Sequence, residues 1–456
     1  MGWRYEIDEI AAQIGCAAPE PGGAPITGVS TDTRTLEPGA LFVALTGPNF
    51  NAEHFVAEAF ARGAAGALCR EPHPEGPCLA VPDPLAAFQA LARRHRMAHD
   101  IPILAITGSC GKTTAKDLTS AVLESRYRVL RTQGNLNNDI GCPLTLMRID
   151  RETEFAVIEM GANHQGEIAH LCTLARPSES VVTIVAPAHL EGFGSIDDVA
   201  RAKGEIVRGL DADGCFYQNM DNPYCRAMGW DFPGEIVRFG REGDVVLRNL
   251  SFDESGEMVL DIAPVGRIRL PLLVPAHATN VLVAVAVGLR HGVTEFEGPL
   301  RAACVRAARF HVRTIAGFEI LDDTYNANPA SMAAALEALG RRPGSGKRFA
   351  ALGDMLELGS DAVAYHRALG EQAAAAGVAG VFAYGAHAHD IIAGARAAGV
   401  GQAEALDSHE AIADALFRAA SPGDSILLKG SRGMRMERVA EALEHRALPG
   451  GEDRPT

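Results

Sequence analysis

The chain has 456 residues, of which 47% are hydrophobic and 22% are charged. At roughly 100–200 residues per domain, this length predicts several globular domains, each with its own core. The 57 acidic and 42 basic residues give a formal charge of −15 at pH 7. This charge argues against a main role in binding nucleic acid or anionic membranes, because no net positive field draws phosphates to the protein.

Other features of the composition favour the cytoplasm. The nine cysteines are scattered and none belongs to a CxxC pair, so we expect neither a disulfide framework nor a zinc site. The first ten residues are acidic and polar, unlike a secretory signal. No run of about 18 apolar residues is present that would span a bilayer. We therefore expect a cytoplasmic protein without an integral membrane segment.

The first hundred residues are typical of a small α/β domain. Their apolar patterns predict, in chain order, a strand at 40–45, a helix at 52–62, a strand at 66–69 and a helix at 84–97. Asp100-Ile101-Pro102 is a plausible linker, because the residue before a proline is pushed out of helical geometry. We place the first domain at residues 1–99.

The second region alternates strands with helices. We expect strands at 103–107, 155–159, 181–186 and 215–218, and helices at 112–125, 167–175, 196–210 and 279–290. Such alternation indicates βαβ units and a parallel sheet. Residues 245–270 differ, since short alternating runs between Gly and Asp turns predict a small antiparallel sheet. This central domain is placed at residues 100–311.

The third region, placed at residues 312–456, has the same alternation. Its expected strands are 318–321, 348–352, 380–384 and 425–428, and its expected helices are 331–339, 363–376, 387–398 and 408–420. The pattern predicts a second doubly wound, Rossmann-like domain. The predicted fold class is therefore α/β with three domains.

A glycine-rich turn between the predicted strand 103–107 and helix 112–125 carries the strongest local signal. It contains Gly108, Ser109, Cys110, Gly111, Lys112, Thr113 and Thr114. In such a turn, backbone N–H groups and a helix N-terminus cradle phosphate oxygens, a lysine reaches the β and γ phosphates, and a hydroxyl ligates Mg²⁺. The usual pattern has glycine where this chain has Ile106. The turn predicts binding of ATP or GTP, and by itself it names no reaction.

Three titratable residues follow predicted strands or lie on a helix further along. Glu159 and His189 come at the ends of apolar strands, and strand ends in α/β folds are where ligands bind. Together they could hold a second metal, although Mg²⁺ prefers oxygen ligands. Taken alone, a glutamate at a strand end is more often a cap or an ion-pair partner, and the same interpretation covers His189. Lys203 alone reads as a solvated helix lysine.

Six segments resemble one family. They are the runs at 135–141 (NLNNDIG), 159–162 (EMGA), 187–191 (PAHLE), 322–329 (DDTYNANP), 352–359 (LGDMLELG) and 429–437 (KGSRGMRME). In this order they resemble the Mur ligases, the ATP-dependent amide-forming enzymes of bacterial cell-wall synthesis. The family's own form of the phosphate loop, TGxxGKT, accounts for Ile106. The resemblance covers nearly the whole chain.

The resemblance implies roles around ATP. The lysine matching Lys203 is carbamoylated by CO₂ in the family, so carbamoyl-Lys203, Glu159 and His189 would surround a second Mg²⁺ and Thr113 the first. Three further residues match ATP contacts: Asn280 for adenine, Asp323 for ribose and Arg309 near the phosphates. At Arg309 the chain departs from the family pattern, because Ala308 precedes it where the family often has glycine.

The resemblance also implies substrate-binding residues. Ser30, Thr31, Arg34, Asn49 and His54 look like a platform for a uridine diphosphate, with Arg34 facing the diphosphate. The alternative for Arg34 is a surface ion pair. Asn138 looks like a contact to the muramoyl substrate, and the residues expected to face the incoming dipeptide or the γ-phosphate are Asn326, Asn328, Lys429 and Arg432.

Within the family, the segments are most similar to members that join D-alanyl-D-alanine to UDP-N-acetylmuramoyl-tripeptide through an acyl phosphate. The implied partners are these two substrates and ATP with two Mg²⁺ ions, and the expected state is a monomer. Two alternatives stay open: another Mur ligase or a folylpolyglutamate synthase, and a nucleotide-dependent switch without ligase chemistry. The switch would need the phosphate loop but not Glu159, His189 and Lys203 together.

Overall fold

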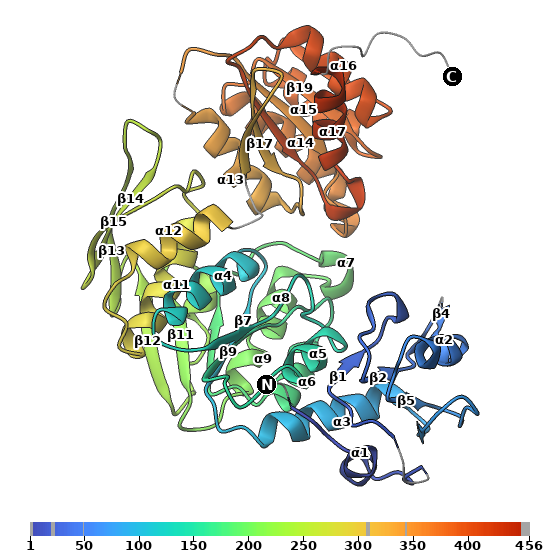
Figure 1. Ribbon diagram of the computed structural model, residues 1–456. Helices are drawn as coiled ribbons and strands as arrows, with labels where there is room; N and C mark the ends of the chain where they lie inside the picture. Colours follow the sequence, from blue (N-terminus) through green and yellow to red (C-terminus); the bar gives the residue numbers. More distant parts are fainter. Residues whose placement is uncertain (1–2, 20–22, 49, 307–310, 343, 448–456) are drawn as a thin grey trace, which may run out of the picture.

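Three large sheets follow one another along the described chain, and a two-stranded hairpin lies beside the first (Figure 1). The structure is a computed structural model and describes residues 3–19, 23–48, 50–306, 311–342 and 344–447. The predicted α/β class is confirmed by their topology. None of the described helices has the length and apolar character needed to cross a membrane.

The first sheet is small and all parallel. Its strands run in the order β1 (Gly28–Ser30), β2 (Ala40–Val43), β5 (Gly66–Cys69) and β6 (Cys78–Ala80). Around it lie α1 (Ile7–Ile14), the turn η1 (Thr33–Thr35), the hairpin β3 (Thr46–Gly47) and β4 (Phe50–Asn51), and α2 (Val56–Ala61). The helix predicted at 52–62 begins as the 3-10 turn η2 (Ala52–Phe55), because the Asn51 side chain accepts a hydrogen bond from the Glu53 backbone and caps the turn.

Helix α3 (Pro84–Met97) joins this sheet to the centre of the molecule. Asp83 caps its N-terminus and Pro84 fits the first turn, where no N–H partner is needed. The helix buries Phe88 and Leu91, and it packs against α1 and against two central helices, α5 (Gly141–Leu146) and α6 (Glu167–Ala175).

The central sheet has nine strands in the order β15-β14-β13-β12-β11-β10-β7-β9-β8. They are β7 (Ile103–Thr107), β8 (Val129–Arg131), β9 (Phe155–Glu159), β10 (Glu179–Val182), β11 (Cys215–Asn219), β12 (Glu235–Gly240), β13 (Val245–Phe252), β14 (Met258–Ala263) and β15 (Gly266–Leu270). The predicted antiparallel strands exist, but they extend the parallel sheet instead of forming a separate one. Two register pairs, Phe239 with Val245 and Gly240 with Val246, join β12 to β13 in parallel.

Alternate residues of the central strands face two different helical layers. Leu104 and Ile106 belong to the core with α4 (Lys112–Glu124), α11 (His277–Arg290) and α12 (Glu297–Arg306), while Ala105 belongs to the core on the other face. That second face carries α6, α7 (Leu190–Phe193), α8 (Ile196–Lys203), α9 (Glu205–Arg208) and α10 (Pro223–Arg226). The single helix predicted at 196–210 is interrupted at Gly204. Burial on both faces explains the continuous apolar runs of these strands.

The third sheet has six strands in the order β16-β17-β21-β18-β19-β20. They are β16 (His311–Ile315), β17 (Phe318–Asp323), β18 (Arg348–Gly353), β19 (Gly380–Tyr384), β20 (Gln402–Ala405) and β21 (Ser425–Lys429). Only β16 runs antiparallel to its neighbour. One face carries α13 (Pro329–Gly340), α14 (Ala362–Ala375) and α15 (Ala388–Ala397), and the other α16 (His409–Ala419) and α17 (Glu437–Ala447), with short turns η3 (Gly359–Asp361) and η4 (Arg432–Met434).

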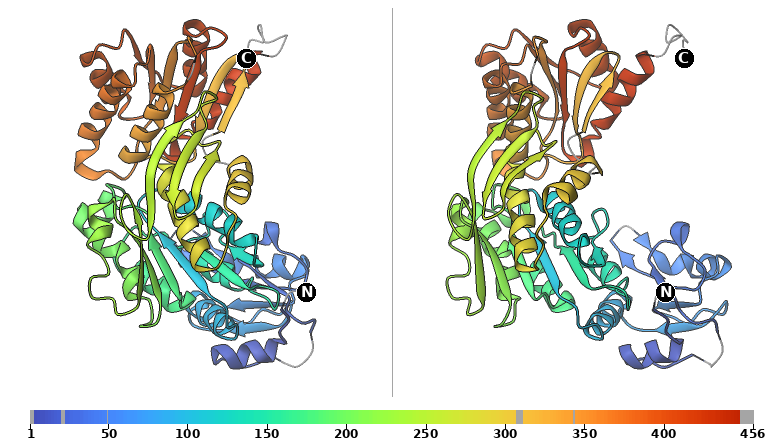
Figure 2. Two further views of the ribbon diagram at one scale, coloured as in Figure 1. Left: turned by 90° about the vertical axis from the view of Figure 1, so that its left-hand side faces the viewer. Right: turned by 60° about the vertical axis from the view of Figure 1, so that its left-hand side comes forward.

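In Figure 2 the third sheet lies above the central sheet, and the right-hand view shows the first sheet beside the central one. The last residues of β9, β17 and β21 and the loop that follows β7 all line one cavity. The fold therefore brings chain segments about two hundred residues apart to the same place.

Candidate active site

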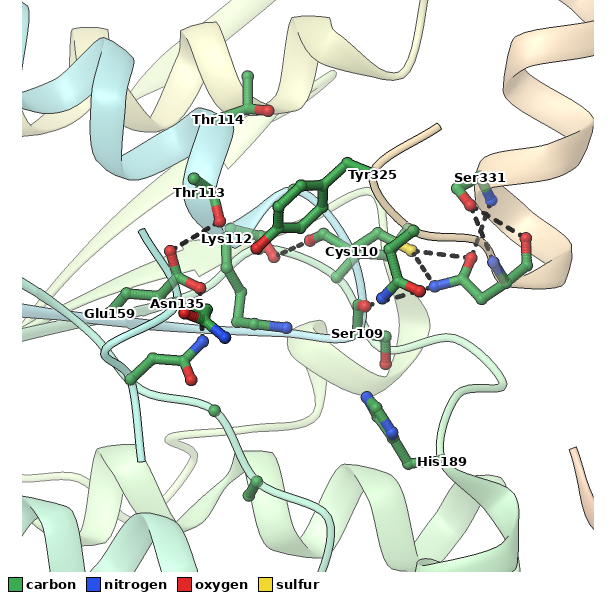
Figure 3. Close-up of a pocket in the computed structure, with 18 of the residues that line it drawn as sticks. Ser109, Cys110, Lys112, Thr113, Thr114, Asn135, Glu159, His189, Tyr325 and Ser331 are labelled. Carbon is green, nitrogen blue, oxygen red and sulfur yellow. Dashed lines mark hydrogen bonds between the residues drawn. The ribbon is translucent and has the colours of Figure 1, made fainter. Parts of the chain in front are cut away.

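A cavity of about 990 Å³ lies between the central and C-terminal sheets. Figure 3 shows the start of α4 on one wall and the start of α13 on the opposite wall. The sequence-predicted residues that line it are Ser109, Cys110, Gly111, Lys112, Thr113, Thr114, Asn138, Glu159, His189, Asn280, Asp323, Asn326, Asn328, Lys429 and Arg432.

Both glycines of the phosphate loop are required by a positive φ and by a neighbour that leaves no room for a Cβ atom. Gly108 has φ 148°, and a Cβ there would lie 2.0 Å from the Thr183 hydroxyl oxygen. Gly111 has φ 79° at the start of α4, and a Cβ there would lie 2.5 Å from Asn280 Oδ1. The loop is held by Ser109, which donates its hydroxyl to the Ala186 carbonyl over 2.8 Å. Its shape is therefore fixed by packing against the strand end beside it.

Lys112 lies at the mouth of this loop. Its Nζ donates to the Gly108 carbonyl over 2.8 Å, and its backbone begins α4. The ammonium group and the positive end of the helix thus face the same part of the cavity, which is an arrangement that attracts phosphate oxygens.

Glu159 occupies the floor of the cavity at the end of β9 and is 2% exposed. Its Oε2 accepts the Thr113 hydroxyl over 2.8 Å, and its Oε1 accepts the Asn137 amide over 2.8 Å. Hydroxyl and carboxylate oxygens are the ligands that Mg²⁺ prefers. In the described parts of the chain, no three His, Cys, Asp or Glu side chains converge as a ready-made metal site.

His189 lines the cavity from the start of α7, in a left-handed conformation with φ 53°. Its Nδ1 is paired with the Glu357 carboxylate of the third domain, and the Glu191 N–H donates to the Glu357 carbonyl over 3.3 Å. Burial lowers the pKa of His189, although Glu357 acts in the opposite direction. The imidazole is therefore at a contact between two domains as well as at the cavity.

Lys203 is fully buried behind the cavity wall. It is 1% exposed, donates to the Ala162 carbonyl over 3.3 Å and lies 5.4 Å from the centre of the Phe193 ring. Burial, followed by the charge of Lys112, lowers its pKa to about 7. The interpretation as a solvated helix lysine is therefore wrong, because the side chain is enclosed, and this enclosure disfavours the charged amine.

The third domain contributes a buried ion pair. Lys429, at the end of β21, is 1% exposed, and its Nζ lies 2.6 Å from Asp323 Oδ2 at the end of β17. The same ammonium donates to the Asn326 carbonyl over 2.8 Å. This network holds the 323–326 segment at the cavity, which Asp323 and Asn326 both line.

Asn328 connects the third domain directly to the phosphate loop. Its Oδ1 caps α13 by accepting the Ser331 N–H over 2.9 Å, and its Nδ2 lies 2.9 Å from Cys110 Sγ. Figure 3 labels Cys110 and Ser331, two partners of Asn328, with Tyr325 beside Cys110. One asparagine thus starts a helix and touches the loop expected to hold phosphate.

The remaining predicted contacts of the cavity differ in their settings. Asn280 is 3% exposed and packs against Gly111. Asn138 uses its Oδ1 to accept the Gly141 N–H over 2.8 Å. Arg432 is exposed and paired with Glu437 over 2.9 Å. Arg309 lies outside the described residues.

The predicted uridine platform is not part of this cavity. Ser30, Thr31, Arg34 and His54 are absent from the described residues that line it, and Asn49 lies outside the described residues. Arg34 forms a two-point ion pair with Asp32, at 2.9 and 2.7 Å, and this pairing holds the pKa of Asp32 at about 2. The ion pair weighed as the alternative for Arg34 is therefore present.

Two residues around Glu159 escaped the sequence analysis. Asn137 was passed over for its neighbour Asn138, although both belong to the same asparagine-rich run. Lys116 is buried at 3% exposure with its Nζ 3.9 Å from Glu159 Oε2. The sequence did offer a signal for Lys116, since a spacing of four residues places it on the same helix face as Lys112.

Comparison with known proteins agrees with this geometry. Residues 106–288 match the Mur ligase middle domain, and residues 308–432 match the Mur ligase glutamate ligase domain. A UDP-N-acetylmuramoyl-tripeptide–D-alanyl-D-alanine ligase of Escherichia coli (strain K12) is 39% identical over 436 residues, which cover 92% of this chain and 95% of the relative.

Solved structures extend the comparison to three dimensions. A crystal structure of MurF from Acinetobacter baumannii superimposes with a TM-score of 0.87 at 29% identity, covering 97% of this chain and 99% of that one. The MurF ligase of Thermotoga maritima in complex with ADP gives a TM-score of 0.82 at 29% identity, covering 92% and 97%.

Proposed function

The chain belongs to the Mur ligase family, and we propose that it joins D-alanyl-D-alanine to UDP-N-acetylmuramoyl-tripeptide at the expense of ATP, a reaction of peptidoglycan synthesis. The observation that carries this proposal is the single cavity lined by Lys112 and Glu159 of the central domain and by Asp323 and Lys429 of the C-terminal domain. The relative at 39% identity is named for this activity, and the alignment covers 95% of its length.

ATP is assigned to the phosphate loop and the surfaces on both sides of it. Gly108–Thr114 and the N-terminus of α4 cradle the phosphates, and Lys112 neutralises the β and γ oxygens. Asn280 contacts the adenine and Asp323 the ribose, with Arg309 near the phosphates. The position of Asn280 supports this assignment, because its side chain lies against Gly111 of the phosphate loop and therefore next to the proposed nucleotide site.

Magnesium fits the oxygen pair formed by Thr113 and Glu159, which line the cavity 2.8 Å apart. These residues would hold one ion, with water and ATP oxygens completing its coordination. A bound Mg²⁺ supplies charge that neutralises the transferring phosphoryl group. This explains why a carboxylate stands in a pocket for an anionic nucleotide.

A second ion at Glu159 and His189 requires a change at Lys203. An ammonium repels a metal, whereas a lysine carbamate offers two oxygens. The lowered pKa of about 7 supports this proposal, because the neutral amine is the form that reacts with CO₂. Its hydrogen bond to Ala162, a cavity-lining residue, places the amine directly behind the wall.

The chemistry begins with a poor electrophile, the terminal carboxylate of the tripeptide. We infer that this carboxylate attacks the γ-phosphate of ATP and gives an acyl phosphate and ADP; the dipeptide amine then attacks the acyl carbon and phosphate leaves. Two anions must meet in the first step. Lys112 and the positive end of α4 lower their repulsion and stabilise charge on the transferring oxygens.

The other substrates are assigned to the two ends of the cavity. Asn138 contacts the muramoyl peptide, and Ser30, Thr31, Arg34, Asn49 and His54 form the uridine diphosphate platform of the first domain. Binding there requires Arg34 to exchange Asp32 for a diphosphate. Asn326, Asn328, Lys429 and Arg432 face the dipeptide or the γ-phosphate.

The domain boundaries 1–99, 100–311 and 312–456 belong to the same proposal, one domain for each substrate. One chain supplies all the residues assigned to the cavity, which supports a monomer. We place the protein in the cytoplasm, because the proposed reaction needs ATP and a nucleotide-linked substrate, and both are supplied there.

The test is phosphate release from ATP with each candidate UDP-muramoyl peptide, with and without D-alanyl-D-alanine. We expect release only when the tripeptide form, the dipeptide and Mg²⁺ are all present, with the pentapeptide product seen by mass spectrometry. Release with a shorter UDP-muramoyl peptide would point to another Mur ligase, and release with a folate substrate to folylpolyglutamate synthase. Hydrolysis independent of any acceptor would identify a nucleotide-dependent switch.

A further inference from the structure

A second lysine of α4 lies behind the carboxylate at the floor of the cavity. Lys116 follows Lys112 by four residues, and residues at this spacing lie on the same helix face. Its side chain is only 3% exposed, and among the described residues it is not part of the cavity lining. The ammonium group is therefore enclosed between α4 and the sheet.

Two carboxylates approach this ammonium group. Its Nζ lies 3.4 Å from Asp117 Oδ1 and 3.9 Å from Glu159 Oε2. Asp117 is partly exposed, and its Oδ1 has Arg131 Nε within 3.9 Å. Glu159 is 2% exposed, and its two close hydrogen-bond donors, Thr113 and Asn137, are neutral. Glu159 is the carboxylate that most needs the enclosed charge, because an uncompensated buried charge is costly.

We propose that Lys116 is a positioning residue of the ligase reaction, which acts through Glu159 by holding the carboxylate toward the nucleotide. Groups behind a metal-binding carboxylate set its orientation and commonly change metal affinity when they are removed. Lys116 holds Oε2 from behind, while Thr113 and Asn137 hold the two oxygens from the cavity side. The inference rests on the proposed function, because Glu159 is a metal ligand only there.

Lys116→Met tests this role, because methionine keeps much of the length and the apolar stem but loses the charge. We expect Mn²⁺ binding in the presence of a non-hydrolysable ATP analogue, followed by electron paramagnetic resonance, to weaken about tenfold. The Mg²⁺ concentration for half-maximal turnover should rise equally, with the KM for the UDP substrate unchanged. Lys116→Arg, which keeps the charge, should recover most of the affinity. Unchanged or tighter Mn²⁺ binding in Lys116→Met overturns the proposal.

Two substitutions on the same helix serve as matched controls. Thr119→Val removes a buried hydroxyl that has no hydrogen-bond partner in the described structure, and Asp117→Asn removes the other carboxylate near Lys116. Both variants should bind Mn²⁺ like the wild type. If Asp117→Asn loses as much affinity as Lys116→Met, the lysine acts through Asp117 and the proposal fails.

A double-mutant cycle covers the case in which Lys116→Met unfolds. The lysine substitution should cost less free energy of unfolding in the Glu159→Gln background than in the wild type, because the carboxylate charge it serves is gone. Strictly additive effects would overturn the proposal. Mn²⁺ binding and unfolding do not require turnover, so these results are distinguishable from a failure of the phosphate-release test.

Discussion

Burial decides the chemistry of single residues around the cavity. Lys203 and Lys429 are both 1% exposed, but their neighbours differ. Lys429 faces the Asp323 carboxylate at 2.6 Å, whereas Lys203 donates its hydrogen bond to the neutral carbonyl of Ala162. An unpaired buried ammonium gives up its proton more readily, and this difference makes Lys203, not Lys429, the candidate for reaction with CO₂.

Lys203→Ala should lose at least about a hundredfold in kcat, because the variant lacks the metal ligand proposed at this position. A short carboxylic acid such as formate should restore part of the activity by supplying the missing oxygens. The measurement is the turnover of Lys203→Ala with and without the acid. Lys347→Ala, on a segment outside the cavity lining, is the matched control. Full activity without the acid would exclude the carbamate.

His95 should make stability depend on pH. Its Nε2 lies 2.8 Å from the Ile149 carbonyl and its Nδ1 3.0 Å from the Tyr5 hydroxyl, and burial lowers its pKa from 6.5 to about 4. The unfolded chain then binds the proton first, so stability is complete above pH 6.5 and falls as the pH drops toward 4, by on the order of 3 kcal/mol.

The measurement for His95 is the free energy of unfolding from pH 7 to pH 4 in the wild type and in His95→Gln. The glutamine does not titrate, so the variant should lose less stability over this window. Parallel curves for the two proteins would show that His95 carries no such linkage.

At the scale of elements, the sharp turn from β7 into α4 depends on glycine. Gly111 has a positive φ, and its Cα faces the Asn280 side chain on α11. The turn therefore couples two helices that pack on the same face of the central sheet. A side chain at this position changes both the backbone and the proposed adenine contact.

Gly111→Ala should raise the KM for ATP about tenfold, because the added Cβ displaces Asn280 from a position 2.5 Å away. The control is Gly399→Ala, where φ is also positive but no atom lies within 4 Å. Both variants should lose about 1–2 kcal/mol of stability from backbone strain. An equal KM in both would mean that Asn280 does not contact the nucleotide.

At the scale of the whole molecule, the central and C-terminal domains meet through polar contacts at the cavity. Cys110 touches Asn328, and His189 pairs with Glu357. These contacts join the proposed phosphate and metal residues of one domain to the segment that carries Asp323 in the other. Assembly of the site therefore depends on the placement of domains as well as on each sheet.

Asp323→Ala should have two separable effects. It should raise the KM for ATP by loss of the ribose contact, and it should destabilise the protein by about 3–5 kcal/mol, because Lys429 remains buried without its partner. Adding Lys429→Met should restore much of the stability without restoring the KM. Thermal unfolding and ATP saturation curves measure the two effects. A KM that recovers together with stability would assign Asp323 a purely structural role.

Much of this protein could be predicted from local patterns in the sequence. An apolar run predicts the strand 103–107, glycine residues predict the turn after it, and the spacing of apolar residues predicts the helix that begins at Lys112. All three signals are properties of consecutive residues. The resemblance likewise predicts Glu159, His189 and Lys203 as one metal site, and this assignment stays a prediction. The edge strand β8 was missed, because three residues including an arginine give no periodic signal.

The tertiary structure decided what the side chains meet. Lys203 reads as a solvated helix residue until α8 is packed against the sheet, and Lys116 shows its relation to Glu159 only when α4 lies over β9. The resemblance alone assigns Arg34 to a diphosphate and does not indicate that Asp32 is its partner in this structure. Charge and pKa depend on neighbours and on water exclusion, and these come from segments far apart in the chain, so the sequence determined the elements while packing determined their electrostatics.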